Sequence, residues 1–145
     1  MLFCDTSALI KLYLHEPHSK ALRDLAAGAD AVAVCRIAWA EAHAAMAHRE
    51  RLVRADAGVI RQARRALARD WQSYLILEVT QALVELAGDH AETFALRGYD
   101  SVQLAAAHRL AEQTQLPTLF ACFDDRLNKA ARILGLQAPF GDILD

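Results

Sequence analysis

Short apolar runs alternate with longer amphipathic segments along the chain. The short runs are bounded by polar or turn-forming residues, which predicts buried β-strands. In the longer segments apolar residues recur at helical spacing, which predicts helices that cover a sheet. Strands are expected at residues 2–5, 31–35, 75–79 and 119–123, with a short edge strand in the tail from Leu136. Helices are expected at about residues 7–14, 17–27, 37–52, 55–74, 81–96, 100–114 and 125–134.

Proline and glycine refine these boundaries. Pro17 is expected in the first turn of the second helix, where proline is tolerated, and Gly28 ends that helix. Gly98 breaks the chain before the helix that Asp100 opens, and Gly135 stops the last helix. The two helices in the middle of the chain, joined by a short connection, could form a hairpin.

This order of elements indicates an α/β sandwich in which helices flank a mainly parallel central sheet of four or five strands. Neither a linker nor an internal repeat divides the chain, so residues 1–145 are expected to form a single domain. The pattern does not fix the order of the strands. In parallel sheets, ligands bind outside the carboxyl ends of the strands. Asp5 and Asp124 lie at the ends of predicted strands, so both are expected at that edge.

Composition narrows the class of protein. A hydrophobic content of 54% with 23% charged residues excludes a disordered chain. No stretch approaches the roughly 18 consecutive apolar residues that span a bilayer, and no basic segment precedes Asp5, so we expect a cytoplasmic protein without a secretory signal. Cys4, Cys35 and Cys122 lack CxxC spacing and lie in or beside predicted strands, so they are expected to be buried rather than to bind zinc.

Basic residues gather in one stretch, although the net charge of the chain is −2. They are mostly arginines, whose forked guanidinium group suits phosphate better than the lysine ammonium does. Arg61, Arg65 and Arg69 share one face of a predicted helix, so they are candidates for contacts with the phosphates of a polyanion. The alternative is a solvated helix face. The stretch comprises Arg49, Arg51, Arg54, Arg61, Arg64, Arg65 and Arg69.

Four carboxylates stand next to apolar runs, where an unpaired carboxylate would lose its hydration. Asp5 and Asp124 end such runs, and Asp100 opens the apolar stretch 102–107. Glu41 lies within an alanine-rich predicted helix. Acids in such positions suggest a cation that supplies the missing positive charge. Mg²⁺ or Mn²⁺ suits carboxylate oxygens and retained water, and either ion can activate water and stabilise phosphate charge.

Helix capping is the competing explanation for three of these acids. Asp5, Asp100 and Asp124 each precede a predicted helix, and aspartate is a favoured N-cap residue. Thr6 or Ser7 could cap the first helix instead, which would leave Asp5 free for another role. Capping would make these acids structural.

Glu41 is harder to explain in that way, because it is expected in the middle of a helix. Ile37, Ala38, Ala44 and Ala45 stand three and four residues away from it and share its face. The carboxylate would therefore project from the stripe that meets the core. A surface position, or a buried ion pair with an arginine, is the alternative to a cation ligand.

Ordered motifs surround the four acids. They are FCDTSALIKLY at residues 3–13 with EP at 16–17, RIAWAE at 36–41, LRGYDSVQLAAA at 96–107, FDDRL at 123–127 and AARILGL at 130–136. Together these motifs resemble the PIN-domain toxins of the VapC type. The set covers essentially the whole chain in the order of that family, which makes the resemblance specific.

The resemblance implies a PIN-like α/β/α sandwich and a Mg²⁺- or Mn²⁺-dependent endoribonuclease, the toxin of a type II toxin–antitoxin pair. It implies that metal-activated water hydrolyses the phosphodiesters of an RNA substrate. It also implies a homodimer that is silenced by a small VapB-type antitoxin, in a complex that could be larger still. The C-terminal segment of such an antitoxin enters the active-site groove.

Asp5, Glu41, Asp100 and Asp124 match the acidic metal-site positions of the family. By this resemblance, Asp5, Glu41 and Asp100 would hold the main ion directly or through its waters. Asp124 would support a second ion or orient water. All four are therefore the predicted catalytic and metal-binding residues.

Two hydroxyl residues and one departure complete the comparison. Ser7 matches a hydroxyl position that helps to organise the site, and Thr6 is a second candidate for that role. The family commonly has Thr or Ser two residues before the fourth acid, where this chain has Cys122. In the doublet at residues 124–125, Asp124 fits the family's spacing better, and Asp125 is expected to cap the following helix.

Other functions fit the same residues less well. A catalytically silent PIN domain that acts as a binding partner, and a PIN nuclease of RNA processing outside a toxin–antitoxin pair, both remain open. A phosphoaspartyl hydrolase usually needs a second acid two residues after Asp5, where Ser7 stands. A phosphorylation-controlled receiver module needs an acidic pair after the first strand and a lysine after the last, and neither is evident.

Overall fold

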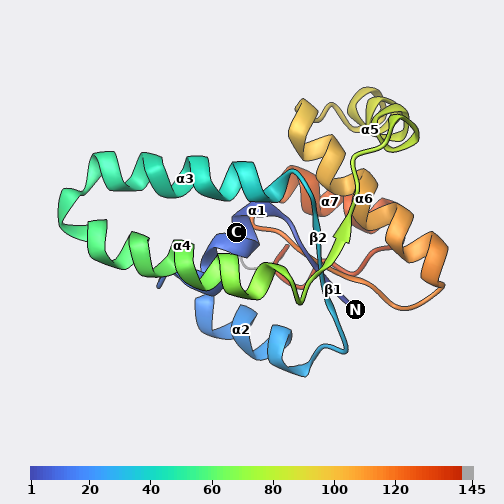
Figure 1. Ribbon diagram of the computed structural model, residues 1–145. Helices are drawn as coiled ribbons and strands as arrows, with labels where there is room; N and C mark the ends of the chain where they lie inside the picture. Colours follow the sequence, from blue (N-terminus) through green and yellow to red (C-terminus); the bar gives the residue numbers. More distant parts are fainter. Residues whose placement is uncertain (142–145) are drawn as a thin grey trace.

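The computed structural model describes residues 1–141 and has a parallel sheet at its centre (Figure 1). The sheet has four strands in the order β3-β2-β1-β4. The strands of this region are β1 (Leu2–Cys4), β2 (Val32–Cys35), β3 (Leu75–Leu77) and β4 (Leu119–Ala121). Its helices are α1 (Thr6–Tyr13), α2 (Ser19–Gly28), α3 (Ala38–Leu52), α4 (Ala57–Trp71), α5 (Gln81–Phe94), α6 (Gly98–Thr114) and α7 (Asp125–Ile133), with a 3₁₀ turn at Arg54–Asp56.

Helices cover both faces of the sheet, which confirms the predicted α/β sandwich. Successive side chains of a strand point to opposite faces. Phe3 therefore packs with α5, α6 and α7, whereas Leu2 and Cys4 pack with α1 to α4. The ring of Phe120 stacks on that of Phe3, with 5.8 Å between the centroids. Because β1 is buried on both faces, its sequence is continuously apolar instead of alternating.

The start of α2 differs from the prediction. Pro17 lies in a turn before the helix, and the helix begins at Ser19. His18 adopts the left-handed conformation, with φ 69°, which the interior of a right-handed helix does not accommodate. The helix therefore begins after His18, and it ends at Gly28 as predicted.

Several other predicted elements are shorter than expected. The helix expected to reach residue 74 ends at Trp71. The edge strand expected in the tail is reduced, within residues 1–141, to one isolated bridge between Leu119 and Gln137. The sheet of this region therefore has four strands. All three cysteines are buried, as expected for small apolar side chains.

Helices α3 and α4 form the expected hairpin, which extends away from the sheet at one side of the molecule (Figure 1). Ala42 and Met46 of α3 share a buried cluster with Ile60 and Ala63 of α4. Alanine at two of these positions lets the helices approach closely. In the part of the chain that the structure describes, no helix has the length and apolar character needed to cross a membrane.

The order of the strands reverses at β1, because β2 and β3 lie on one side of it and β4 lies on the other. Strand β2 pairs with one side of β1 and β4 with the other. Such a switch point opens a crevice outside the carboxyl ends of the two strands, and ligands of open α/β sheets bind there. Cys4 is in register with Ala121, and the backbone N–H of Asp5 donates to the carbonyl of Ala121 at 3.1 Å. The segments that follow β1 and β4 are thus side by side.

A histidine pair joins α5 to α6. His90 Nε2 and His108 Nδ1 are 3.2 Å apart, and His90 is buried. Burial lowers the pKa of His90, and the positive charge of a protonated His108 lowers it further, while Asp89 and Glu112 act in the opposite direction. The folded protein therefore favours neutral His90.

We expect this pair to make the free energy of unfolding fall as the pH decreases below about 6.5, the pKa of an unfolded histidine. The folded state binds the proton less well than the unfolded chain does, so the stabilisation is complete above that pH and is lost below it. His90→Gln should weaken this dependence in urea unfolding measured from about pH 7.5 to about pH 5. His48→Gln, which changes an exposed histidine, is the control. Equal pH dependence in wild type and His90→Gln would show that the pair has no such role.

Candidate active site

Asp5 directly follows β1, and its side chain caps α1. Its Oδ1 accepts hydrogen bonds from the backbone N–H of Ala8 at 2.9 Å and from the hydroxyl of Ser7 at 2.7 Å. Neither Thr6 nor Ser7 replaces it as the cap, because the helix already begins at Thr6. Capping and a role in catalysis are therefore not alternatives for Asp5, since the cap bond engages only one of its oxygens.

Asp5 is only 5% exposed. Burial raises its pKa from the usual 3.8 to about 6, and the negative charge of Asp100 raises it further. Hydrogen bonds from Ser7, Ala8 and Cys122 lower this pKa, but burial has the larger effect. A nearby cation would relieve the cost of ionising such a group.

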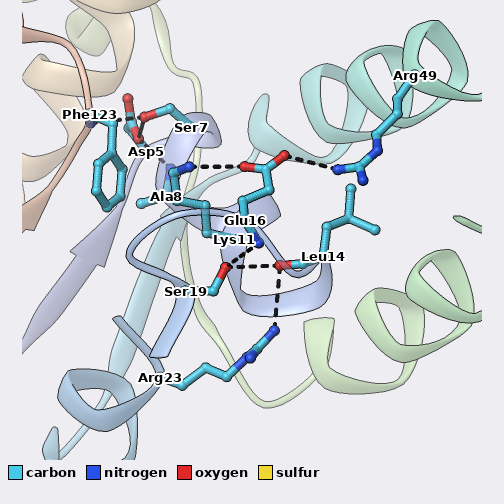
Figure 2. A network of polar contacts seen from close by, with 10 residues as sticks. All are labelled: Asp5, Ser7, Ala8, Lys11, Leu14, Glu16, Ser19, Arg23, Arg49 and Phe123. Atoms are coloured by element: carbon cyan, nitrogen blue, oxygen red, sulfur yellow. Dashed lines mark hydrogen bonds and ion pairs between the residues drawn. The ribbon is translucent and has the colours of Figure 1, made fainter. Parts of the chain in front are cut away.

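Ser7 joins the segments that follow β1 and β4. Its hydroxyl donates to Asp5 and accepts a hydrogen bond from the backbone N–H of Phe123 at 3.1 Å. Figure 2 shows both contacts as dashed lines that meet at the Ser7 hydroxyl. Because Phe123 immediately precedes Asp124, one hydroxyl group fixes the backbone beside two of the acids. The predicted role of Ser7 in organising a catalytic site stays a prediction.

Glu41 lies in the first turn of α3, not in the middle of the helix as expected. The helix begins at Ala38, so the carboxylate stands near the helix N-terminus, where negative charge is favoured. Its Oε1 accepts hydrogen bonds from Thr6 Oγ1 at 2.9 Å and Gln103 Nε2 at 2.8 Å. Within residues 1–141, its hydrogen-bond partners are thus a hydroxyl and an amide rather than an arginine.

Asp100 lies in the first turn of α6, which begins at Gly98. The alternative explanation of Asp100 as the cap of this helix does not hold, because Arg97 occupies the N-cap position. Asp100 Oδ2 accepts a hydrogen bond from Arg97 Nε at 3.2 Å. The Arg97 side chain is 83% exposed, so this pair contributes little to stability. Asp100 is nevertheless close enough to affect the pKa of Asp5.

Asp124 caps α7 by accepting a hydrogen bond from the backbone N–H of Leu127 at 2.9 Å. Asp125 does not cap this helix as expected. It is the first helical residue and pairs with Lys129 at 2.7 Å. Cys122, which stands where a hydroxyl is usual, accepts a hydrogen bond from the backbone N–H of Asp124 through its sulfur at 3.3 Å. The thiol therefore keeps a polar contact at this position.

Two cavities meet at Asp100. One, of about 440 Å³, is lined by Asp100, Asp124 and Asp125 together with neighbouring residues. The other, of about 850 Å³, has Glu41 and Asp100 in its lining and apolar residues of α5, including Val84. Asp100 therefore lies at the centre of the acid group, between Glu41 on one side and Asp124 on the other.

These carboxylates offer hard oxygen ligands without forming a closed cage. Within residues 1–141, no three His, Cys, Asp or Glu side chains are placed so that they could hold a metal ion together. Hydrogen bonds in this region engage Oε1 of Glu41, Oδ2 of Asp100 and Oδ1 of Asp124, so the second oxygen of each can meet a cation or its water. Mg²⁺ usually binds one or two carboxylates directly and keeps several waters. The donor set therefore fits a hydrated ion better than one enclosed by all four acids.

Comparison with known proteins identifies the family. The PIN domain family matches residues 2–133. The chain belongs to the PIN domain family. Ribonuclease VapC45 and Ribonuclease VapC49 of Mycobacterium tuberculosis are each 30% identical to it over 137 residues, which cover 94% of this chain and 93% of theirs. Ribonuclease VapC46 of the same species is 33% identical over 135 residues, or 93% of each chain.

Within the PIN family the chain is of the VapC type, as its motifs suggested. A solved structure has the same fold. It is a toxin–antitoxin complex from Klebsiella pneumoniae, one chain of which superimposes with a TM-score of 0.64 at 19% identity. The superposition covers 96% of this chain and 98% of that one. The predicted PIN-like α/β/α sandwich is thus confirmed.

The acid site of this PIN domain includes a residue that was not predicted from the sequence. Gln103 is 2% exposed and donates hydrogen bonds to both Glu41 and Thr6. It lies three residues after Asp100, on the same face of the helix. That spacing was the available signal, together with the presence of an amide inside the apolar stretch 102–107.

A chain of ion pairs supports α1 of this PIN domain next to the acids (Figure 2). Lys11 pairs with Glu16 at 2.9 Å, and Glu16 pairs with Arg49 of α3 at 3.2 Å. The ammonium of Lys11 also lies 4.8 Å from the centre of the Phe123 ring. These contacts tie α1 to α3 and to the segment after β4, and those three segments carry or flank Asp5, Glu41 and Asp124.

The arginine stripe lies on the hairpin. Arg61, Arg65 and Arg69 are exposed on α4, and Arg69 forms an ion pair with Asp70 at 3.2 Å. In Figure 1 much of α4 lies away from the sheet. Contact between this stripe and RNA phosphates stays a prediction.

Ser7→Ala should destabilise the protein by about 1–3 kcal/mol, because the backbone N–H of Phe123 loses its partner and Asp5 loses a donor. Urea unfolding would measure the loss. Ser73→Ala, which removes an exposed hydroxyl bonded to the Asp70 carbonyl, is the matched control and should change stability much less. If both variants unfolded at the same urea concentration, Ser7 would not be the link described here.

Proposed function

We propose that this protein is a divalent-metal-dependent endoribonuclease and the toxin of a type II toxin–antitoxin pair. The observation that carries the proposal is the position of Asp5, Asp100 and Asp124 around the switch point of the sheet, with Glu41 beside the larger cavity. Membership of the VapC type supports it, because those relatives are named ribonucleases. The related fold in a toxin–antitoxin complex supports the toxin assignment.

In this proposal the side chains hold and orient the reacting groups. Mg²⁺ or Mn²⁺ would supply a water of lowered pKa and positive charge beside the phosphodiester. Asp5, Glu41 and Asp100 would hold this ion directly or through its waters, and Asp124 would orient water or support a second ion. Hydrolysis adds water across a phosphorus–oxygen bond, so no side chain needs to form a covalent intermediate.

Two arginines close to the acids are better placed to bind the RNA phosphate that reacts than the arginine stripe on α4 is. Arg97 and Arg126 line the cavity of about 440 Å³ that also contains Asp100 and Asp124. Their guanidinium groups can place an RNA phosphate beside the carboxylates, whose negative charge would otherwise repel it. The stripe of α4 would then contact more distant parts of the RNA, and binding would weaken with salt.

The partner in this proposal is a small VapB-type antitoxin. The cavity of about 850 Å³ combines apolar walls with two acids in its lining, which suits an amphipathic peptide segment. A segment of the antitoxin seated there would cover Glu41 and Asp100 and so block the reaction. We propose a cytoplasmic homodimer as the toxin, with the single PIN domain of residues 1–145 as its subunit.

The decisive experiment is cleavage of total cellular RNA by the purified protein. We expect internal cuts with Mg²⁺ or Mn²⁺, no cuts with EDTA, and recovery when either ion is added in excess. Sequencing the new RNA ends would identify the target among tRNA, ribosomal RNA and messenger RNA. Cleavage that persists in EDTA would overturn the metal dependence, and intact RNA under every condition would favour the silent binding partner.

A growth assay separates a toxin from an RNA-processing nuclease. Expression of the protein alone should arrest growth, and co-expression with the antitoxin should restore it. Arrest that no antitoxin relieves, together with accurate processing of one RNA precursor, would favour the processing role.

A further inference from the structure

Gln103 is held between two residues of the acid site, while one of its own polar atoms has no partner in the part of the chain that the structure describes. Its Nε2 donates to Glu41 Oε1 at 2.8 Å and to Thr6 Oγ1 at 3.1 Å. The hydroxyl of Thr6 donates to the same Glu41 oxygen at 2.9 Å, which closes a ring of polar contacts. The Gln103 carbonyl oxygen is buried and has no hydrogen-bond partner among residues 1–141.

The chemistry of the carboxylate fixes the orientation of this amide. An ionised carboxylate only accepts hydrogen bonds, so Gln103 must present its nitrogen to Glu41 and its oxygen elsewhere. A buried carbonyl without a partner destabilises the fold, because it has lost its hydrogen bonds to water. An apolar side chain of similar size would avoid that cost. A buried group of this kind calls for an explanation, and a role in a functional site is one such explanation.

A second buried amide provides a comparison. Asn128 also has a side-chain oxygen without a partner in the described region, but its nitrogen donates to the backbone carbonyl of Cys122 at 3.0 Å. Its amide therefore holds the backbone in place. Gln103 differs because its amide holds the side chains of Glu41 and Thr6. The two contacts, and not the unpaired oxygen alone, single out Gln103.

We propose that Gln103 is a positioning residue for Glu41 and a hydrogen-bond acceptor for a water molecule carried by the catalytic cation. Gln103 and Thr6 together occupy Oε1 of Glu41, which leaves Oε2 for the hydrated ion. The carbonyl oxygen is bonded to the same carbon as the nitrogen that contacts Glu41, so an acceptor without a partner in the described region stands next to the Glu41 contact. This inference rests on the proposed function in one respect, namely that a hydrated divalent cation binds there.

Gln103→Met tests the proposal, because methionine is of similar size and removes both the donors and the unpaired acceptor. Without a divalent cation, we expect its melting temperature to equal or exceed that of wild type. We expect Mn²⁺ to bind about 10–100-fold more weakly by calorimetry. In RNA cleavage, kcat should fall while KM for RNA stays unchanged. A merely structural role would instead lower the melting temperature and leave the Mn²⁺ affinity of the folded protein unaltered, and that outcome would overturn the proposal.

Two further sets of variants complete the test. Gln62→Met, at an exposed position of α4, is the matched control and should behave as wild type. Thr6→Val should also weaken Mn²⁺ binding, whereas Thr6→Ser should preserve it. Because Gln103 and Thr6 act on the same oxygen, the effects of Gln103→Met and Thr6→Val should not be additive. If Gln103→Met did not fold, the Thr6 pair alone would decide, and equal Mn²⁺ affinity of Thr6→Val and Thr6→Ser would overturn the proposal.

The Mn²⁺ titration separates failure of this inference from failure of the proposed function. It requires no RNA, so a wild-type protein that binds Mn²⁺ but cleaves nothing would contradict the nuclease assignment and leave the role of Gln103 testable. A Gln103→Met protein with unchanged Mn²⁺ affinity and full cleavage would overturn only the role of Gln103.

Discussion

Asp5→Asn protein should cleave RNA at least about 100-fold more slowly than wild type and should nevertheless unfold at a higher temperature. Loss of outer contacts in metal sites already lowers activity about 10–100-fold, so loss of a direct carboxylate should lower it further. The gain in stability follows from the pKa of Asp5, which burial raises from 3.8 to about 6. Each pKa unit corresponds to 1.36 kcal/mol, so the ionised carboxylate destabilises the fold at neutral pH by about 3 kcal/mol. Asparagine has no such charge and can still accept the capping bond from Ala8.

The gain in stability of Asp5→Asn should depend on pH in a defined direction. A carboxyl group with a raised pKa binds its proton more tightly in the folded protein, so its ionisation destabilises the fold as the pH rises from about 4 to about 6. The advantage of Asp5→Asn should therefore be complete near pH 7 and should vanish near pH 4. Thermal unfolding without divalent cations would measure it, with Asp30→Asn, at an exposed position, as the control. A lower melting temperature for Asp5→Asn at neutral pH would refute this account of the buried charge.

Asp5 and Asp124 show how much of the site could be predicted from the sequence. Both acids end apolar runs, and in a parallel sheet the carboxyl ends of the strands lie at one edge. Their shared location therefore followed from the alternation of strands and helices alone. The strand order did not follow, because it depends on which side of β1 each later strand joins. That choice creates the switch point beside Cys4 and Ala121.

The positions of Glu41 and Asp100 within their helices could not be predicted from the periodicity of apolar residues. Apolar spacing identifies the face of a helix that is buried, but it fixes the first turn only to within a few residues. Glu41 was expected in the middle of a helix and Asp100 at the start of one, with capping as the alternative, whereas both lie in first turns. In both positions the carboxylate stands near a helix N-terminus, which favours its negative charge. The site thus gathers acids at helix starts: two are caps and two are first-turn residues.

Gln103 could not have been assigned from the pattern of the chain, because its role depends on contacts between three elements. Thr6 begins α1, Glu41 lies in α3, and Gln103 lies in α6. Their hydrogen bonds join positions 35 to 97 residues apart in the sequence. A single sequence shows that each residue is polar and near an apolar run, but it does not show that they meet. Such contacts become visible only when the helices are packed on the sheet.

Asp100→Asn should abolish RNA cleavage to the same extent as Asp5→Asn but without the gain in stability. Asp100 lies between the two cavities, so we expect its carboxylate to hold the cation directly. Its side chain is 31% exposed, and its pair with the exposed Arg97 contributes little. The free energy of unfolding without cations should therefore change by no more than about 1 kcal/mol. RNA cleavage, Mn²⁺ calorimetry and urea unfolding of the same preparation would test these three expectations.

The two aspartates should also affect each other in a way that unfolding can detect. The charge of Asp100 contributes to the raised pKa of Asp5. In Asp100→Asn protein, the pH range over which the ionisation of Asp5 changes the free energy of unfolding should therefore lie lower than in wild type. Asp24→Asn, which removes an exposed carboxylate of α2, is the matched control and should shift neither this curve nor RNA cleavage. An Asp100→Asn protein that cleaved RNA normally would remove Asp100 from the centre of the acid group. The cation would then have to lie between Asp5 and Asp124, where the carboxyl ends of β1 and β4 meet.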